Sequence, residues 1–449
     1  MQDPLRATAG RHGARRALVD SSAGYLVSWF SLDDLADTWA RRLVREGVQP
    51  GQRVAVSEAA GVRFAALLFA CLRVGAAMVP LSPRSPAADV EAVLADARPR
   101  LLVEGGEVQP LPDPVTGPEG DLCVLYTSGT AGPPKGVRQT LANHVASAYG
   151  CRESLGADDR DRWLLVLAPH HVGGLSMFLR SAVCDQPLVT LARFDEAAVL
   201  EAMQREHPTL LSVVPVMLTR LLRAGGLEPL RRLRAVLVGG ASAPADQVRE
   251  WAAMGLQVCP TYGLTETSSQ VATVPPGRAS ELAGTAGFGG RHARIELGPA
   301  PGFGDGLGEI IVSGPAVSPG YVDPDIVPAP HDGRFATGDL GRIDGGVLTV
   351  VGRRDDCIIT GGENVQPDEV ETVLRAHRAV GDAAVAGRPD PEWGEVVSAW
   401  VVGDESEQPA LDRWCRERLP PHKVPRRWAF VPELPRTDGG KLVRRLLSP

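Results

Sequence analysis

The sequence predicts an α/β protein in which a large N-terminal domain contains doubly wound sheets and a small α+β domain lies at the C-terminus. Short apolar runs, for example residues 53–56 and 77–80, alternate with longer amphipathic segments, for example residues 64–74. This alternation is typical of largely parallel strands whose two faces are covered by helices. A chain of 449 residues is also too long for one ordinary domain.

The N-terminal elements follow from the positions of helix caps, apolar runs and turn residues. Ser31 and Asp34 predict the start of a helix that runs to about residue 45. Further helices are expected near residues 64–74, 87–96, 140–150, 174–183, 195–205, 215–223 and 244–254. Strands are expected near residues 53–56, 77–80, 100–103, 122–126, 163–167, 187–191, 209–213 and 234–238. Ligands bind beyond the carboxyl ends of strands in such sheets, so the loops after residues 126 and 238 are candidate site loops.

The pattern changes after about residue 282. Short strands separated by glycine and proline turns predict a β-rich subdomain that runs to about residue 351. Beyond it, a helix that opens at Pro367, strands near residues 395–402 and 426–431, and a helix near residues 408–418 predict a compact α+β tail.

Composition and charge exclude several classes of function. The net charge of −7 and the pI of about 5.8 argue against non-specific binding to nucleic acid or to a membrane surface. No window approaches 18 uninterrupted apolar residues, so we expect no membrane span. The seven cysteines are scattered without a Cys-x-x-Cys pair, and the N-terminus has no apolar signal segment. We therefore expect a cytoplasmic protein with reduced thiols.

Residues 126–136 form a segment rich in hydroxyls and glycines that contains one lysine. It is not a Walker A loop, because Pro134 precedes Lys135 and Gly136 follows it. Its backbone N–H groups, hydroxyls and cation could still wrap phosphates through charge-assisted hydrogen bonds. An ordinary surface loop would have the same composition. The residues that would bind phosphate are Thr127, Ser128, Gly129, Thr130 and Lys135.

Four segments occur in a distinctive order: residues 126–136, 261–267 and 352–355, and a glycine-rich turn at 434–441 that ends in Lys441. Together they resemble the signature of the acyl-adenylate-forming superfamily, which includes acyl-CoA synthetases, adenylation domains and luciferases. The resemblance runs from about residue 31 to residue 441 and implies activation of a carboxylate with ATP. It also implies a hinge at Asp355. The hinge would separate a large AMP-binding domain, residues 1–354 with the β-rich subdomain at about 282–351, from a small mobile domain, residues 355–449.

The resemblance implies roles in nucleotide binding. Tyr262 would stack on adenine, Thr265 would contact the α-phosphate, and Glu266 would hold Mg²⁺, which proteins usually bind through one or two carboxylates plus phosphate oxygens. Asp339 and Arg353 would grip the ribose. In isolation these residues would be read as a helix cap, a turn residue and solvated charges. The small residues that would allow close approach beside the adenine are Gly239, Gly240 and Ala241.

The resemblance also implies the role of Lys441 in the first step. As a carboxylate attacks the α-phosphate, negative charge builds on both groups, and a bridging lysine would stabilise it. In the family the small domain then rotates, and Gly361 and Gly362 would line the tunnel for the CoA thiol. Without the upstream motifs, Lys441 would be read as part of a basic tail with Arg444 and Arg445.

Residues 168–175 occupy the place of the segment that lines the acyl pocket in this family. They contain no aspartate, which disfavours an α-amino acid, and His171 would guard the pocket. Segments 169–175, 211–218 and 262–270 resemble the o-succinylbenzoate–CoA ligases of menaquinone biosynthesis. That acid carries a second carboxylate, for which the candidate anchors are Ser268, Ser269, Arg193 and Arg278. The expected substrate-binding residues are His171, Gly263, Ser268 and Ser269.

The chain is therefore expected to be an AMP-forming acid–thiol ligase that acts on a small-molecule carboxylate, with o-succinylbenzoate as the first candidate. ATP, Mg²⁺ and coenzyme A would be its cofactor and co-substrates. Two other readings stay open: another aryl- or acyl-CoA ligase or carrier-protein-loading enzyme of specialised metabolism, and an inactive nucleotide-binding homologue. A homodimer is the assembly that we would test first.

Overall fold

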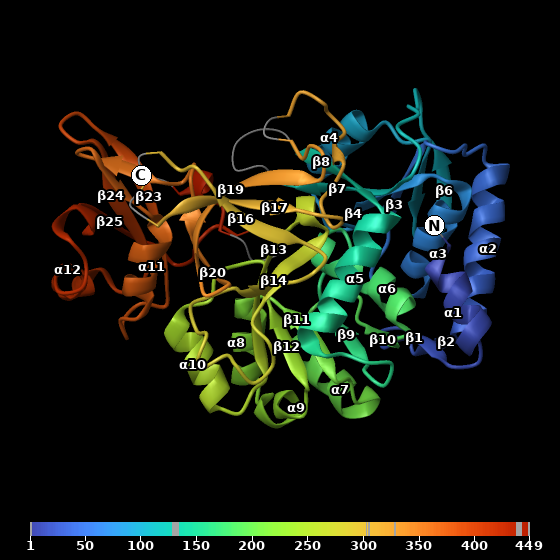
Figure 1. Cartoon of the computed structure of the whole chain (residues 1–449), viewed down its shortest axis with the longest axis horizontal. Coiled ribbons are helices and arrows are strands. Elements are labelled where there is room, and N and C mark those ends of the chain that lie inside the picture. Colours follow the sequence, from blue (N-terminus) through green and yellow to red (C-terminus); the bar gives the residue numbers. More distant parts are fainter. Residues whose placement is uncertain are drawn as a thin grey trace. The chain divides into compact units, whose positions relative to one another are not determined.

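The α/β fold predicted from the sequence is confirmed by a computed structural model of the chain (Figure 1). The structure describes residues 2–127, 134–301, 303, 306–326, 329–436 and 442–447, apart from the side chain of Arg445. These residues divide into two compact units. The first comprises Met1–Ile295 and Val312–Phe335, and the second comprises Glu296–Ile311 and Ala336–Pro449. The predicted boundary at Asp355 lies within the second unit and stays a prediction.

The first unit contains a seven-stranded sheet with the order β18-β8-β7-β4-β3-β5-β6. Its strands are β3 (Arg53–Ser57), β4 (Ala77–Leu81), β5 (Leu101–Glu104), β6 (Glu107–Pro110), β7 (Asp121–Thr127), β8 (Lys135–Thr140) and β18 (Gly320–Tyr321). The central strands pair in parallel, as the alternating pattern predicts, while β8 returns antiparallel to β7. The helices of this part of the chain are α1 (Pro4–His12), α2 (Trp29–Arg45), α3 (Val62–Val74) and α4 (Ala87–Ala97).

A second sheet of the first unit has the order β15-β14-β13-β12-β11-β9-β10-β1-β2. Its strands are β1 (Arg16–Asp20), β2 (Tyr25–Ser28), β9 (Trp163–Leu165), β10 (Leu188–Thr190), β11 (Leu210–Val213), β12 (Ala235–Val238), β13 (Val258–Leu264), β14 (Ser269–Thr273) and β15 (Gly287–Gly289). Within this sheet, β13, β12, β11, β9, β10 and β1 each pair in parallel with the next strand in the order. The edge strand β2 pairs antiparallel with β1. The helices are α5 (Leu141–Leu155), α6 (Val172–Cys184), α7 (Glu196–Glu206), α8 (Pro215–Arg223), α9 (Leu227–Arg231) and α10 (Ala245–Ala253).

Helices α3 and α6 lie in one apolar core with strands of both sheets. Phe64 of α3 and Phe178 of α6 stack with their ring centroids 5.1 Å apart. Helix α3 is apolar around most of its circumference, and eight consecutive residues, from Phe64 to Cys71, are buried. A helix with this pattern must be covered on all sides, which explains its place between layers.

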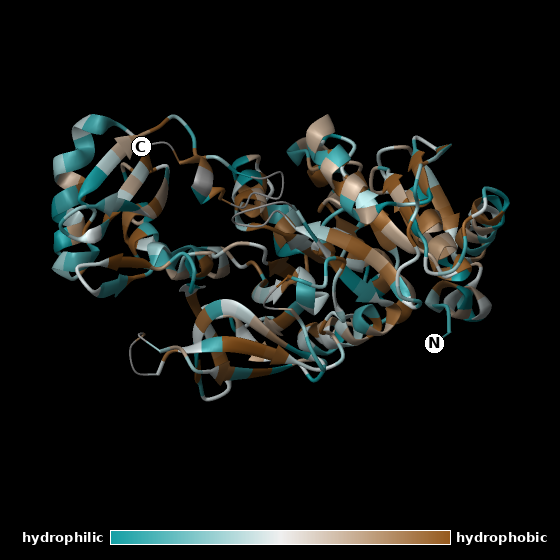
Figure 2. Cartoon of the chain, turned by 90° about the horizontal axis from the view of Figure 1, so that it is seen from above, coloured by the Kyte–Doolittle hydropathy of each residue, from teal (hydrophilic) through white to brown (hydrophobic). Residues whose placement is uncertain are grey.

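Four strands that lie wholly or mostly in the second unit have the order β16-β17-β19-β20. They are β16 (Arg294–Gly298), β17 (Gly308–Ser313), β19 (Arg334–Asp344) and β20 (Val347–Arg353). The β-rich subdomain expected at about residues 282–351 stays a prediction. The C-terminal part packs α11 (Pro367–Arg375) and α12 (Gln408–Arg416) with a sheet of β21 (Ile358–Thr360), β22 (Glu363–Val365), β23 (Asp382–Asp390), β24 (Gly394–Val402) and β25 (Arg427–Phe430). Figure 2 shows hydrophobic residues concentrated on the strands and hydrophilic residues on α12.

The structure corrects the start of one predicted helix and adds a strand that was not predicted. Helix α2 begins at Trp29 rather than at Ser31, because the Ser28 hydroxyl accepts a hydrogen bond from the backbone N–H of Ser31 and so acts as its cap. Strand β8 was not predicted. Its residues are polar or small at several positions, so they do not form an apolar run. No helix in the described part of the chain is both long enough and apolar enough to cross a membrane.

Candidate functional site

The segment after β13 forms a tight turn that displays Thr265 and Glu266. Thr267 is buried, and its hydroxyl bonds with the backbone N–H and C=O of Leu264 and with the C=O of Ser269. Ser268 and Ser269 have φ values of 53° and 100°, an unusual backbone region for residues other than glycine. A Cβ on Gly263 would lie 2.0 Å from the carbonyl oxygen of Ser269, so this hairpin needs glycine there. The turn is thus held by its own residues.

Glu266 is held by a residue that the sequence did not point to. The hydroxyl of Tyr321 donates to Glu266 Oε1 at 2.8 Å, and the backbone N–H of Ser318 donates to the Glu266 carbonyl at 2.8 Å. Oε2 has no donor among the residues that the structure describes. A single carboxylate with one open oxygen fits a magnesium ion that takes most of its ligands from phosphates and water. The described residues contain no group of three or more His, Cys, Asp or Glu side chains placed to hold a metal.

The backbone of Thr265 is held in place by a buried pair of side chains, Gln139 and His144. Gln139 of β8 donates from Nε2 to the Thr265 carbonyl at 2.5 Å, and its Oε1 lies 2.7 Å from His144 Nε2. Gln139 is fully buried, and burial lowers the pKa of His144 to about 3, so the imidazole is neutral at physiological pH. Sequence reasoning missed both residues, because their partner lies more than 120 positions away along the chain.

The predicted nucleotide loops lie at carboxyl ends of strands, as expected. Thr127 ends β7 and pairs with Lys135 of β8, whereas Ser128, Gly129 and Thr130 lie outside the described residues. Gly239, Gly240 and Ala241 follow β12, which pairs in parallel with β13, the strand that contains Tyr262. A Cβ on Gly239 would lie 2.8 Å from Thr261 Cγ2. The structure therefore brings the residues at 239–241 close to the segment around Tyr262.

His171 stands at the N-terminal end of α6 and is exposed, whereas its neighbour His170 is half-buried. Their ring centroids lie 4.3 Å apart. Burial lowers the pKa of His170 to about 3, with a smaller contribution from His171. Gly174 allows α6 to start here, because a Cβ would lie 2.1 Å from the Ala168 carbonyl oxygen. The accessible histidine of the pair is the one predicted to guard the pocket.

In the second unit, the two predicted ribose ligands lie side by side. Asp339 of β19 and Arg353 of β20 are register partners, and Arg353 Nη1 lies 3.4 Å from Asp339 Oδ1. The neighbouring Arg354 instead pairs with Glu309 at 2.7 Å. The carboxylate of Asp339 is largely buried, and that of Asp355 is about two-thirds exposed. Of the two arginines, only Arg353 is placed to act together with Asp339.

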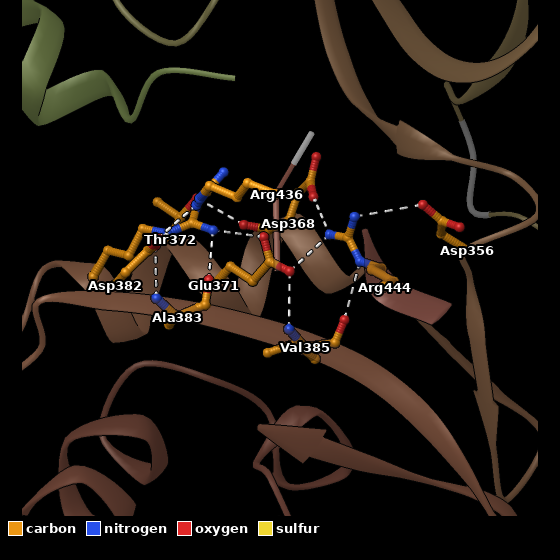
Figure 3. Close-up of polar contacts among 10 residues, drawn as sticks. Asp356, Asp368, Glu371, Thr372, Asp382, Ala383, Val385, Arg436 and Arg444 are labelled. Atoms are coloured by element: carbon orange, nitrogen blue, oxygen red, sulfur yellow. Dashed lines mark hydrogen bonds and ion pairs between the residues drawn. The ribbon is translucent and has the colours of Figure 1, made fainter. Parts of the chain in front are cut away.

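Lys441 lies outside the described residues, but the residues that flank it form a network (Figure 3). Arg436 and Leu442 form a β-bridge, and Val443 N–H donates to the Pro435 carbonyl at 2.9 Å. Arg436 pairs with Asp382 at 2.6 Å.

Arg444 contacts several elements of the same unit. Its Nη2 lies 2.7 Å from Glu371 Oε1 and 2.9 Å from Asp368 Oδ1, and its Nη1 lies 3.6 Å from Asp356 Oδ2 (Figure 3). Its Nε donates to the Val385 carbonyl at 3.1 Å. The segment after Lys441 is therefore tied to α11, to β23 and to the residue that follows the predicted hinge.

The glycines predicted to line the CoA tunnel have left-handed backbones, with φ of 58° at Gly361 and 86° at Gly362. A Cβ on Gly361 would lie 2.8 Å from the ring of Trp393, whereas a Cβ on Gly362 would meet nothing within 4 Å. A side chain is therefore excluded at Gly361 by lack of space, and it is disfavoured at both positions by the backbone conformation.

Comparison with known proteins gives consistent results along the whole chain. The family described as "AMP-binding enzyme" matches residues 5–113 and 104–322, and "AMP-binding enzyme C-terminal domain" matches residues 369–441. The 2-succinylbenzoate–CoA ligase of Bacillus cereus (strain Q1) is 35% identical in an alignment that covers 94% of this chain and 93% of that protein. The enzyme of the same name from Geobacillus kaustophilus (strain HTA426) is 36% identical in an alignment that covers 93% of this chain and 91% of that protein.

Two solved structures of o-succinylbenzoate CoA synthetase from Bacillus subtilis are similar to this one, each at 30% sequence identity. The complex with the acyl-adenylate intermediate OSB-AMP has a TM-score of 0.90 and covers 100% of this chain and 98% of that one. The complex with ATP and a magnesium ion has a TM-score of 0.88 and covers 100% and 99%.

Proposed function

The chain belongs to the AMP-binding enzyme family, and on that premise we propose that it is an ATP-dependent acid–CoA ligase whose acid is 2-succinylbenzoate. The observation that carries this proposal is the similarity to 2-succinylbenzoate–CoA ligases over 94% of the chain. In the first step a carboxylate oxygen attacks the α-phosphorus of ATP, which forms acyl-AMP and releases pyrophosphate. In the second step the thiolate of coenzyme A attacks the acyl carbonyl, which forms the thioester and releases AMP.

Glu266 would hold the magnesium ion of the first step, with Tyr321 fixing the orientation of its carboxylate. The ion would neutralise charge on the phosphates of ATP. Thr265 would donate its hydroxyl to the α-phosphate from a backbone that Gln139 holds in place. A donor that is already in position at the reacting phosphate needs no reorganisation as charge develops there.

Asp339 and Arg353 would hold the ribose. The carboxylate would accept hydrogen bonds from ribose hydroxyls, and the guanidinium at 3.4 Å would help to orient it. Tyr262, with the small residues at 239–241, would bind the adenine ring. Lys135, with Thr127 and residues 128–130, would bind the outer phosphates.

Lys441 would stabilise the charge that builds during adenylation, Asp355 would act as the hinge, and Gly361 and Gly362 would line the path of the CoA thiol. His171, Gly263, Ser268 and Ser269 would line the acyl pocket. We also propose a cytoplasmic location, because all seven cysteines are free thiols and six of them are buried. A homodimer stays a prediction.

The test is to incubate the purified protein with ATP, Mg²⁺ and a panel of carboxylic acids, with and without coenzyme A, and to identify the products by mass. 2-Succinylbenzoyl-CoA together with AMP would support the proposal. A thioester of another acid would keep the chemistry and change the substrate. Acyl-AMP that is transferred to a carrier protein but not to coenzyme A would favour a carrier-loading enzyme. Nucleotide binding without AMP formation from any acid would favour an inactive homologue.

A further inference from the structure

Glu309, near the start of β17, contacts both segments that contain the proposed ribose ligands Asp339 and Arg353. We call these two ligands the ribose clamp. Glu309 itself is 8% exposed. Its Oε1 accepts a hydrogen bond from the backbone N–H of Gly338 at 3.1 Å, and its Oε2 accepts one from Nη1 of Arg354 at 2.7 Å. All five residues belong to the second unit, so these contacts lie within one compact part of the chain.

Each partner of Glu309 is adjacent in sequence to a member of the ribose clamp. Gly338 precedes Asp339 on β19, and Arg354 follows Arg353, the last residue of β20. The backbone N–H of Arg354 also donates to the Gly338 carbonyl at 2.8 Å. Glu309, Gly338 and Arg354 therefore form a closed ring of contacts, which we call the Glu309 bracket. It joins β19 to β20 at the level of the ribose clamp.

The backbone before Asp339 is held to β17 by further bonds. The Thr337 hydroxyl donates to the Ile310 carbonyl at 2.8 Å and accepts a hydrogen bond from the Asp339 N–H at 3.1 Å. Gly338 has a left-handed backbone with φ of 74°, and a Cβ there would lie 3.1 Å from Nη2 of Arg353. The position of the Asp339 backbone thus depends on neighbours that β17 holds in place.

The Glu309 bracket also separates the roles of two adjacent arginines. The side chain of Glu309 is 11% exposed, and a buried carboxylate is costly unless charge and hydrogen bonds compensate it. Arg354 provides that charge through a short, charge-assisted hydrogen bond. Arg353 is the arginine that pairs with Asp339, at 3.4 Å. Without Glu309, the Arg354 guanidinium would lose the partner that holds it on β17.

We propose that Glu309 is a positioning residue for nucleotide binding, which acts through Gly338 and Arg354 to set the geometry of Asp339 and Arg353. This inference rests on the proposed function, in which those two residues hold the ribose. The ribose is present in ATP and in acyl-AMP. Loss of Glu309 should therefore raise KM for ATP in the first half-reaction and KM for acyl-AMP in the second, with a smaller effect on either kcat.

Sequence reasoning missed Glu309 because the positions that it joins are far apart along the chain. Gly338 lies 29 positions after it, and Arg354 lies 45 positions after it. A glutamate at the start of a short strand gives no signal of its own. A purely structural ion pair would have the same contacts, so the test needs a measurement that fold stability alone does not change.

The test measures equilibrium binding of ATP and of 2′-deoxy-ATP, with Mg²⁺ and without any acid, to the full-length wild type and to Glu309→Ala. We expect Glu309→Ala to weaken ATP binding by about 10-fold, because the carboxylate of Asp339 loses its alignment with the ribose hydroxyls. Binding of 2′-deoxy-ATP should weaken by less than about 3-fold, because that nucleotide lacks one of the hydroxyls that the ribose clamp would bind.

Further variants separate the two contacts of Glu309. Glu309→Gln keeps an acceptor for the Gly338 N–H but loses the charge that binds Arg354, so it should recover part of the loss. Arg354→Met removes the other side of the same pair and should also narrow the preference for ATP. Glu417→Ala is the matched control, because Glu417 is exposed and pairs with Arg418 at 2.8 Å in the same unit; it should change neither affinity.

A double variant shows whether Glu309 acts through Asp339. In the Asp339→Asn background, Glu309→Ala should weaken ATP binding by less than about 2-fold, because the carboxylate that it positions is already gone. A full additional loss of about 10-fold would show that Glu309 acts independently of the ribose clamp and would overturn the inference.

Equal weakening of ATP and 2′-deoxy-ATP would also overturn the inference, as would a lower melting temperature with unchanged ATP affinity. Either result leaves the proposed function standing. If Glu309→Ala does not fold, Glu309→Gln and Arg354→Met decide the question by the same comparison. A wild type that binds both nucleotides equally would reject the ribose clamp and this inference together. A wild type that prefers ATP but forms no AMP with any acid would reject the proposed ligase and leave the role of Glu309 to the binding data.

Discussion

Replacing Arg444 with methionine should destabilise the second unit and impair the step assigned to Lys441. The guanidinium donates to Glu371 at 2.7 Å, and the two side chains are 23% and 3% exposed (Figure 3). Loss of a partner from a buried ion pair costs about 3–5 kcal/mol. Arg375 still pairs with Glu371 at 2.9 Å, which places the loss at the lower end, about 3 kcal/mol. Methionine keeps the apolar stem of the side chain, so little packing is lost.

This loss should depend on pH. Burial raises the pKa of Glu371, and Arg444 opposes that rise, so Arg444→Met should raise the pKa further. When folding raises the pKa of a carboxyl, the folded state binds more protons than the unfolded state at pH values between the ordinary pKa and the raised pKa. Stability therefore falls as the pH rises through that window. The deficit of Arg444→Met should be smaller at about pH 5 than at about pH 7.5.

The assay is urea unfolding at both pH values, together with each half-reaction measured separately. Arg416→Met is the matched control, because Arg416 forms a solvent-exposed pair with Asp412 in the same unit. Adding Glu371→Gln to Arg444→Met should restore part of the stability, since the amide leaves no buried charge. Acyl-AMP formation should fall more than thioester formation from supplied acyl-AMP, because Arg444 lies three residues after Lys441. Equal stability of the Arg444 and Arg416 variants, or equal losses at both pH values, would refute the reasoning.

Three further changes test the proposed site. Lys441→Ala should abolish acyl-AMP formation yet still convert supplied acyl-AMP and coenzyme A to the thioester; equal loss in both half-reactions would contradict its role. Tyr321→Phe should raise the Mg²⁺ concentration that gives half-maximal rate by about 10-fold, because Glu266 loses the hydroxyl that orients its carboxylate. An unchanged Mg²⁺ requirement would count against Glu266 as the metal ligand. Asp339→Asn should raise KM for ATP by about 10-fold and narrow the preference for ATP over 2′-deoxy-ATP. An unchanged preference would show that Asp339 does not bind the ribose.

The α/β architecture could be predicted because its determinants are local. Apolar runs at residues 53–56 and 77–80 correspond to β3 and β4, and the apolar segment 64–74 corresponds to α3. Strands β1, β2 and β8 were not predicted. They contain exposed or polar residues, and their pairing with distant strands, such as β1 with β10, provides the stability that their own pattern does not indicate.

The sequence by itself determined the candidate chemistry, because the residue types of the four motifs and their spacing follow directly from the chain. It also identified Glu266, Asp339 and Arg353 as a set. Only the tertiary structure decided which residues support that set. Tyr321 reaches Glu266 from 55 positions away, and Gln139 reaches Thr265 from 126 positions away.

Hydrogen bonds and ion pairs form over about 3 Å, whereas neighbours in sequence report only on the local turn or strand. The motifs can therefore be identified from the order of residues in the chain. The side chains that support them, such as Tyr321 and Gln139, are determined by how distant segments pack together.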